Sequence, residues 1–192
     1  MILKYSFEYP KNIITKFRNM NWILIFSVIA FCIYLVYNIA ALSLFGVPKS
    51  LSMTCYLFKE KWSWSRCLFP IMMLSMAGLL MPAWIEMSTG TNFQFLAFLA
   101  AAGIIFTGAA PAFKSSELEQ SVHMTSAVVA AICALLWVVL VPHLWYVILG
   151  WFVVFAVAAY FTHTVKTSFI YWLETVAFLS TFTSVLIFYT TM

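Results

Sequence analysis

Three ionisable residues, His123, His163 and Glu174, could carry chemistry together if the fold brought them to one place. Two imidazoles and a carboxylate can hold a zinc ion and leave its fourth position open for water or a substrate. Such a centre would suit a metal-dependent hydrolase that acts on lipids inside a membrane. No HExxH or HxxxH spacing surrounds these residues, so no sequence motif supports the zinc ligands.

His123 lies in a polar segment, FKSSELEQSVHMTSA (113–127), directly ahead of a long apolar run. Ser116 and Glu119 match a capping box, which would explain the serine and the glutamate without an active site. His123 follows Glu119 by one helical turn, and Ser126 lies three residues further along the same face. The imidazole could titrate, bind a metal or donate to a lipid phosphate. Alternatively, it is a structural histidine that bonds with Glu119 or a neighbouring carbonyl.

Glu174 lies about two turns inside the last apolar stretch of the chain. Carboxylates inside a membrane are energetically expensive, and their presence suggests a functional role. Its simplest partner would be His123, or Asn38 in the middle of the first apolar stretch. A proton-coupled transporter centred on Glu174 and Asn38 is therefore a further hypothesis.

The composition indicates a chain that lies mostly in lipid. Of 192 residues, 65% are hydrophobic and only 8% are charged, whereas ordinary soluble proteins carry about 25% charged residues. The ten lysines and arginines are scattered at the ends of apolar runs and form no basic stripe, which argues against nucleic acid as a partner. They are better placed to contact lipid headgroups.

The apolar runs predict an all-α fold, a polytopic bundle of about six membrane-spanning helices. About 20 apolar residues in a helix cross the hydrocarbon layer. The predicted spans are 22–45, 68–87, 93–112, 117–141, 143–161 and 168–190. The break between the fourth and fifth spans depends on Pro142 and His143 alone, so a tight re-entrant hairpin is an alternative there. We expect one transmembrane domain over 22–192, preceded by an interfacial or flexible tail over 1–21.

Alternating spans place His123, His163 and Glu174 on the same side of the membrane. Six cations share that side: Lys49, Lys59, Lys61, Arg66, Lys114 and Lys166. Small residues at a spacing of four in the third span (Ala97, Ala101) and in the fourth (Ala130, Ala134) predict that these two spans pack against each other.

Two stretches resemble a known group of proteins. KSLSMTCY (49–56) and the run FQFLAFLAAAGIIFTGAAPAF leading into ELEQSVHMTSA (93–127) are similar to small six-helix membrane proteins of Bacteroides-type bacteria and their phages, and distantly to the Frag1/DUF998-like proteins. The group would have an acidic residue and an aromatic residue where this chain has Met53 and Cys55, which argues against a catalytic role for 50–56. The resemblance implies a six-helix fold in the cell (inner) membrane and implies no activity.

Three functions follow, in order of preference. The first is a non-enzymatic bundle that binds a lipid or a small hydrophobic ligand, or serves another membrane protein as a sensor or accessory subunit. The second is the zinc-dependent lipid hydrolase, and the third is the transporter. The preferred function needs no cofactor, and its partners are membrane lipids or a second membrane protein.

Overall fold

The computed structural model describes residues 11–62, 65, 67–112 and 116–191, without the side chains of 11–21, 112 and 116–119. The elements in this part of the chain are helices, as predicted. They are α1 (Lys11–Phe45), α2 (Met53–Lys61), α3 (Leu68–Ser88), α4 (Gln94–Ala109), the short 3-10 helix η2 (Ala110–Ala112), α5 (Ser116–Leu140), α6 (Trp145–Phe161) and α7 (Phe169–Thr191).

Four helical segments of the described chain are long and apolar enough to cross a membrane. These segments are Trp22–Phe45, Leu68–Ser88, Gln120–Leu140 and Phe169–Thr191. The apolar helices α4 and α6 are shorter, at 16 and 17 residues. At about 1.5 Å per residue they are about 24–26 Å long, somewhat less than the ~30 Å hydrocarbon layer. The chain thus has the helices of an integral membrane protein.

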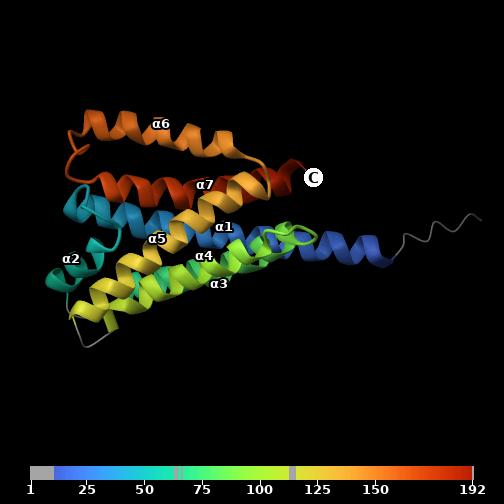
Figure 1. Ribbon diagram of the computed structural model, residues 1–192, viewed down its shortest axis with the longest axis horizontal. Helices are drawn as coiled ribbons and strands as arrows, with labels where there is room; N and C mark the ends of the chain where they lie inside the picture. The colour runs from blue at the N-terminus through green and yellow to red at the C-terminus, as the bar shows by residue number, and fades with distance from the viewer. Residues whose placement is uncertain (1–10, 63–64, 66, 113–115, 192) are drawn as a thin grey trace, which may run out of the picture.

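Helix α1 is longer than the first predicted span. It begins at Lys11, directly after Pro10, and continues without interruption to Phe45. Residues 11–21 of the predicted tail therefore belong to the same helix as the span, while residues 1–10 lie outside the described chain. Figure 1 shows this first part of α1 projecting beyond the other helices.

The break predicted at Pro142 separates two antiparallel helices. Helix α5 ends at Leu140 and α6 begins at Trp145. His143 between them has a φ of 57°, in the left-handed region that reverses the chain within a few residues. Figure 1 shows α6 running back along the bundle in the direction opposite to α5.

Helices α4 and α5 pack closely against each other, which confirms the predicted pairing of the third and fourth spans. A Cβ atom added to Gly103 would lie 2.7 Å from the Ser126 carbonyl oxygen and 2.8 Å from the Ala130 Cβ. The glycine hydrogen is what allows the two backbones to approach so closely. A hydrogen bond of 2.9 Å between the Thr107 and Ser126 hydroxyls joins the same two helices.

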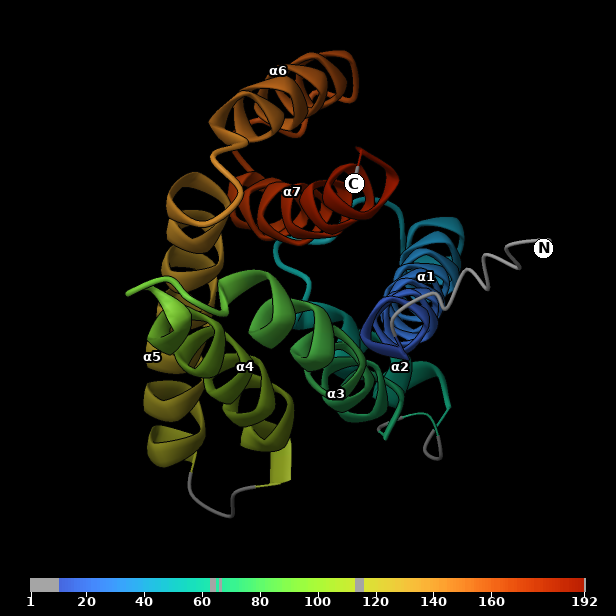
Figure 2. The ribbon, with the colours of Figure 1, turned by 90° about the vertical axis from the view of Figure 1, so that its right-hand side faces the viewer.

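Helices α1, α5 and α6 each pack against α7. Aromatic rings connect α7 with α1, where Tyr34 and Phe178 have ring centroids 5.0 Å apart. On its other side α7 holds α6 through the Trp151 indole, which donates to the Thr183 hydroxyl over 3.0 Å. Viewed along the bundle, α6 is the outermost helix, and α7 separates it from α1, α3 and α4 (Figure 2).

Candidate functional site

A cleft opens between α3, α4, α5 and α7, and we call it the central cleft. The space within it that is open to a water-sized sphere has a volume of about 40 Å³. The loop between α1 and α2 contributes Leu51 and Ser52, and Glu174 of α7 also lines the cleft. Its other lining residues are Phe69, Met73, Leu80, Trp84, Ile104, Thr107, Ala127, Ala130, Ala131, Ala134, Ala177, Phe178 and Thr181.

The central cleft is long and narrow. Its α3 wall runs from Phe69 to Trp84, which is 15 residues or about 22 Å along a helix. Its α5 wall consists of alanines spaced three and four residues apart, whose small side chains leave room beside the larger residues of α3 and α7. The cleft therefore follows α3 as a channel, while its α5 and α7 walls (127–134 and 174–181) line only about 10 Å of that length.

The threonine hydroxyl groups in the cleft walls form hydrogen bonds within the protein. The Thr107 hydroxyl donates to the Gly103 carbonyl over 2.8 Å, and the Thr181 hydroxyl donates to the Ala177 carbonyl over 2.9 Å. A threonine whose proton is bonded to its own helix presents chiefly its methyl group to its surroundings. The walls are consequently apolar along most of their length.

Glu174 is the one ionisable side chain among the residues that line the cleft. Its Oε2 atom accepts a hydrogen bond of 2.6 Å from the backbone N–H of Leu51. Leu51 lies just ahead of α2, so the carboxylate also lies near the positive end of that helix. The sequence points to Glu174 as an unusual residue, but its partner is a backbone amide that no side-chain pattern reveals.

Two further bonds fasten the α1–α2 loop to the beginning of α7. The Tyr171 backbone N–H donates to the Lys49 carbonyl over 3.2 Å, and the Ser168 hydroxyl donates to the Val47 carbonyl over 3.3 Å. The Tyr171 amide belongs to the first turn of α7, where backbone amides have no partner in their own helix, and Ser168 directly precedes the helix. The loop therefore forms a fixed rim at the Glu174 end of the cleft.

Asn38 lies close to this rim without bonding to Glu174. Its Oδ1 atom accepts from the Tyr171 hydroxyl over 3.2 Å, and its Nδ2 atom donates to the Tyr34 carbonyl over 2.9 Å. Tyr171 precedes Glu174 by one helical turn. The structure thus brings Asn38 and Glu174 to the same region of the bundle, with Tyr171 between them.

Trp84 lines the cleft at the far end of its α3 wall. The residue is 1% exposed, and its indole N–H has no hydrogen-bond partner in the described part of the protein. The neighbouring Trp137 differs, because its indole donates to the Ser88 hydroxyl over 2.8 Å. Buried indole N–H groups usually have a partner. Trp84 is a site residue that the sequence analysis did not identify.

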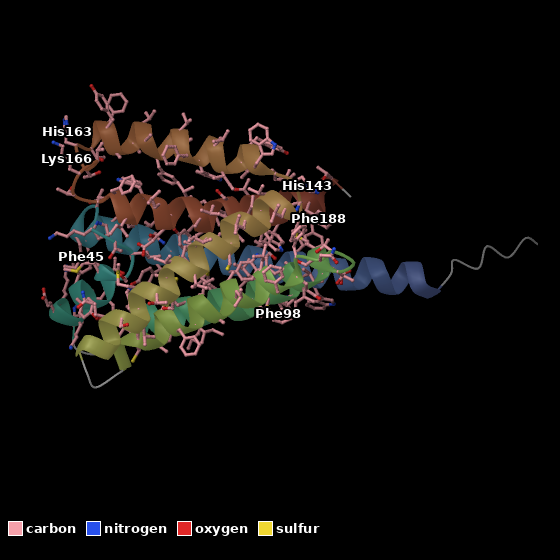
Figure 3. The ribbon with its side chains drawn as sticks, viewed as in Figure 1. Phe45, Phe98, His143, His163, Lys166 and Phe188 are labelled. Atoms are coloured by element: carbon pink, nitrogen blue, oxygen red, sulfur yellow. The ribbon has the colours of Figure 1, made fainter. Side chains whose placement is uncertain are left out.

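The other predicted site residues do not line the central cleft. Ser126 is buried, and its hydroxyl oxygen lies 2.9 Å from the Thr107 hydroxyl and 3.1 Å from the His123 carbonyl oxygen. His163 is exposed in the turn between α6 and α7 with a φ of 54°, and Figure 3 shows it beside Lys166 at the end of the bundle. The Glu119 side chain lies outside the described residues, as does the predicted capping box.

The described part of the chain contains no group of three or more His, Cys, Asp or Glu side chains able to hold a metal ion. His123, His163 and Glu174 accordingly form no such group. The four cysteines, all within the described residues, form no disulfide. Zinc binding stays a prediction, which elemental analysis of the purified protein and its His123→Ala variant would test.

Comparison of the chain with family models, with curated proteins and with solved structures gives no match in any of the three. A functional assignment must therefore come from the geometry of the central cleft.

Proposed function

We propose that this protein is a multi-pass protein of the cell (inner) membrane that binds a hydrophobic or amphiphilic small molecule in its central cleft. The single observation that carries the proposal is an elongated apolar space with one carboxylate near one end. Six crossings follow if α4 and α6 span the membrane with the four longer helices. The ligand would come from the surrounding lipid.

The dimensions of the cleft favour a single extended chain over a compact molecule. Its lining residues extend about 22 Å along α3. Alanines on α5 face Phe69, Met73 and Leu80 of α3, and apolar groups of this kind suit an alkyl chain. A bulky ring system would require these helices to move apart.

Close packing and hydrogen bonds hold the helices that line the cleft in position. Helix α5 is held against α4 by the close contact at Gly103 and by the bond between Thr107 and Ser126. Helix α7 is held at its first turn by the α1–α2 loop. A preformed site loses less conformational entropy when a ligand binds, which favours affinity.

The proposal can be tested with hexadecanol, a single-chain probe without charge. We expect native mass spectrometry of the detergent-purified protein to show one bound hexadecanol. Replacing Ala131→Phe places a ring in the cleft and should weaken binding by about tenfold or more, since overfilling a packed space costs about 1–3 kcal/mol.

Val128→Phe is the matched control. Val128 lies on the same helix, but its side chain is 52% exposed and does not line the cleft. It should leave hexadecanol binding unchanged. Thermal unfolding of both variants would show whether they remain folded. Equal binding by folded Ala131→Phe and wild-type protein would overturn the proposal.

A further inference from the structure

We propose that the ligand is a single-chain amine, with its ammonium group bound by Glu174 and its alkyl chain extending along α3 toward Trp84. This inference depends on the proposed function and adds to it the chemistry of the headgroup. The observation behind it is the position of one incompletely bonded carboxylate at one end of an apolar channel.

The hydrogen bonding of Glu174 leaves room for a second donor. Its Oε2 atom accepts from the Leu51 N–H, and no other described residue donates a hydrogen bond to the carboxylate. A carboxylate has two oxygen atoms and about four acceptor sites. Glu174 is half-buried, and carboxylates removed from water are stabilised by several donors or by a paired charge.

The charge of Glu174 also lacks a countercharge among the described residues. The Leu51 amide is a neutral donor, and the dipole of the short helix α2 amounts to only about half an elementary charge. No described lysine or arginine forms a hydrogen bond with the carboxylate. A cationic ligand would supply both the missing charge and the missing donors.

The position of Glu174 sets the direction of the ligand. Glu174 lies near the start of α7, and the turn before α7 places His163 and Lys166 at an outer end of the bundle (Figure 3). The ammonium group would thus lie toward the headgroup region of the membrane. The apolar walls beyond Glu174 lead into the bundle, where an alkyl chain replaces lipid contacts.

The same charge discriminates against other amphiphiles. A fatty acid or a lipid phosphate would bring a second negative charge to the Glu174 carboxylate, and like charges at such distances repel. An alcohol of equal chain length would fill the apolar channel and donate one hydrogen bond without neutralising the charge. We therefore expect affinity to decrease from amine to alcohol to carboxylate.

A competition experiment tests this order. Hexadecylamine, hexadecanol and palmitate would each compete at neutral pH with radiolabelled hexadecylamine on the purified protein. Hexadecylamine should bind about tenfold or more tightly than hexadecanol, since a hydrogen bond between charged groups is about 1–2 kcal/mol stronger than a neutral one.

Glu174→Gln is the decisive variant. Its amide oxygen can still accept from Leu51, so the α1–α2 loop keeps its attachment while the charge is lost. The variant should bind the amine and the alcohol about equally. Wild-type preference for the amine that persists in Glu174→Gln would overturn the headgroup assignment.

The results also separate the two proposals. Binding of all three probes with equal affinity would contradict the amine assignment and leave the cleft as the site of an apolar chain. Binding of none would contradict the proposed function itself. A Glu174→Gln protein with unchanged melting temperature confirms that a loss of preference comes from the charge and not from unfolding.

Discussion

Helices α4 and α5 pack against each other more closely than helices α6 and α7 do. Between α4 and α5, Gly103 and Ala130 allow two backbones to touch. Between α6 and α7, aromatic rings such as those of Phe155 and Trp172, with centroids 5.2 Å apart, hold the helices further from each other. A groove with a volume of about 200 Å³ remains between α6 and α7.

The difference shows which pair of helices is held together more firmly. Water expulsion does not drive helices together in lipid, so close packing and hydrogen bonds must do so. The α4–α5 pair has both and forms a rigid wall of the central cleft. The α6–α7 pair has one indole–hydroxyl bond between its helices and an open groove lined by exposed side chains such as Phe152 and Phe169.

The largest loss of stability is expected at the contact between α4 and α5. Gly103→Leu would place a side chain where the Ser126 carbonyl and Ala130 already lie, which forces α4 and α5 apart. We expect destabilisation of at least about 3 kcal/mol, at the upper end for overpacking. The measurement is the unfolding free energy in detergent micelles.

Gly150→Ala on α6 is the control for this substitution. An added Cβ there would have no atom within 4 Å. Alanine also favours a helix over glycine, so the variant should be unchanged or stabilised by up to about 1 kcal/mol. Equal destabilisation by the two substitutions would mean that Gly103 is no more closely packed than Gly150 on α6.

A smaller effect is expected where α5 meets α3. Ser88→Ala removes the acceptor of the fully buried Trp137 indole, and an unpaired buried donor costs about 1–3 kcal/mol. Ser184→Ala offers the comparison, because the Ser184 hydroxyl is buried without a partner among the described residues. Chemical denaturation should show a loss of stability for Ser88→Ala and little change for Ser184→Ala. The reverse order would contradict the hydrogen bond between Trp137 and Ser88.

The smallest loss of stability is expected at the contact between α6 and α7. Trp151→Phe removes the indole that donates to Thr183, and hydrogen bonds between membrane helices are worth about 0.6 kcal/mol on average. We expect a loss below about 1 kcal/mol in the same denaturation assay. Trp145→Phe, at an indole that is 56% exposed, should cost less still. A loss for Trp151→Phe as large as that for Gly103→Leu would remove the distinction between the two regions.

Much of the fold follows from long apolar runs and their prolines. The third predicted span, 93–112, corresponds to α4 and η2 together, and Pro111 lies in that final turn. Helix α2 is not predicted, because its nine residues contain three charges and no long apolar run. A short helix of this kind depends on tertiary contacts, here with α1, where the Tyr37 and Thr54 hydroxyls form a hydrogen bond and the rings of Phe45 and Phe58 pack together.

The central cleft is less predictable than the helices around it. The alanines of α5 indicate a face that packs closely, and Ala130 does contact α4. Ala127, Ala131 and Ala134 line empty space, because residue spacing specifies a helix face and not what lies opposite. The unpartnered Trp84 depends equally on the relative placement of α3 and α5.

The most direct test of the central cleft as a binding site is photo-crosslinking with hexadecylamine that carries a diazirine at the end of its chain. We predict that peptide sequencing finds the label on α3 near Leu80 and Trp84, with labelling suppressed by excess hexadecylamine. Labels confined to exposed positions of α6, such as Phe152 and Val153, would contradict this account.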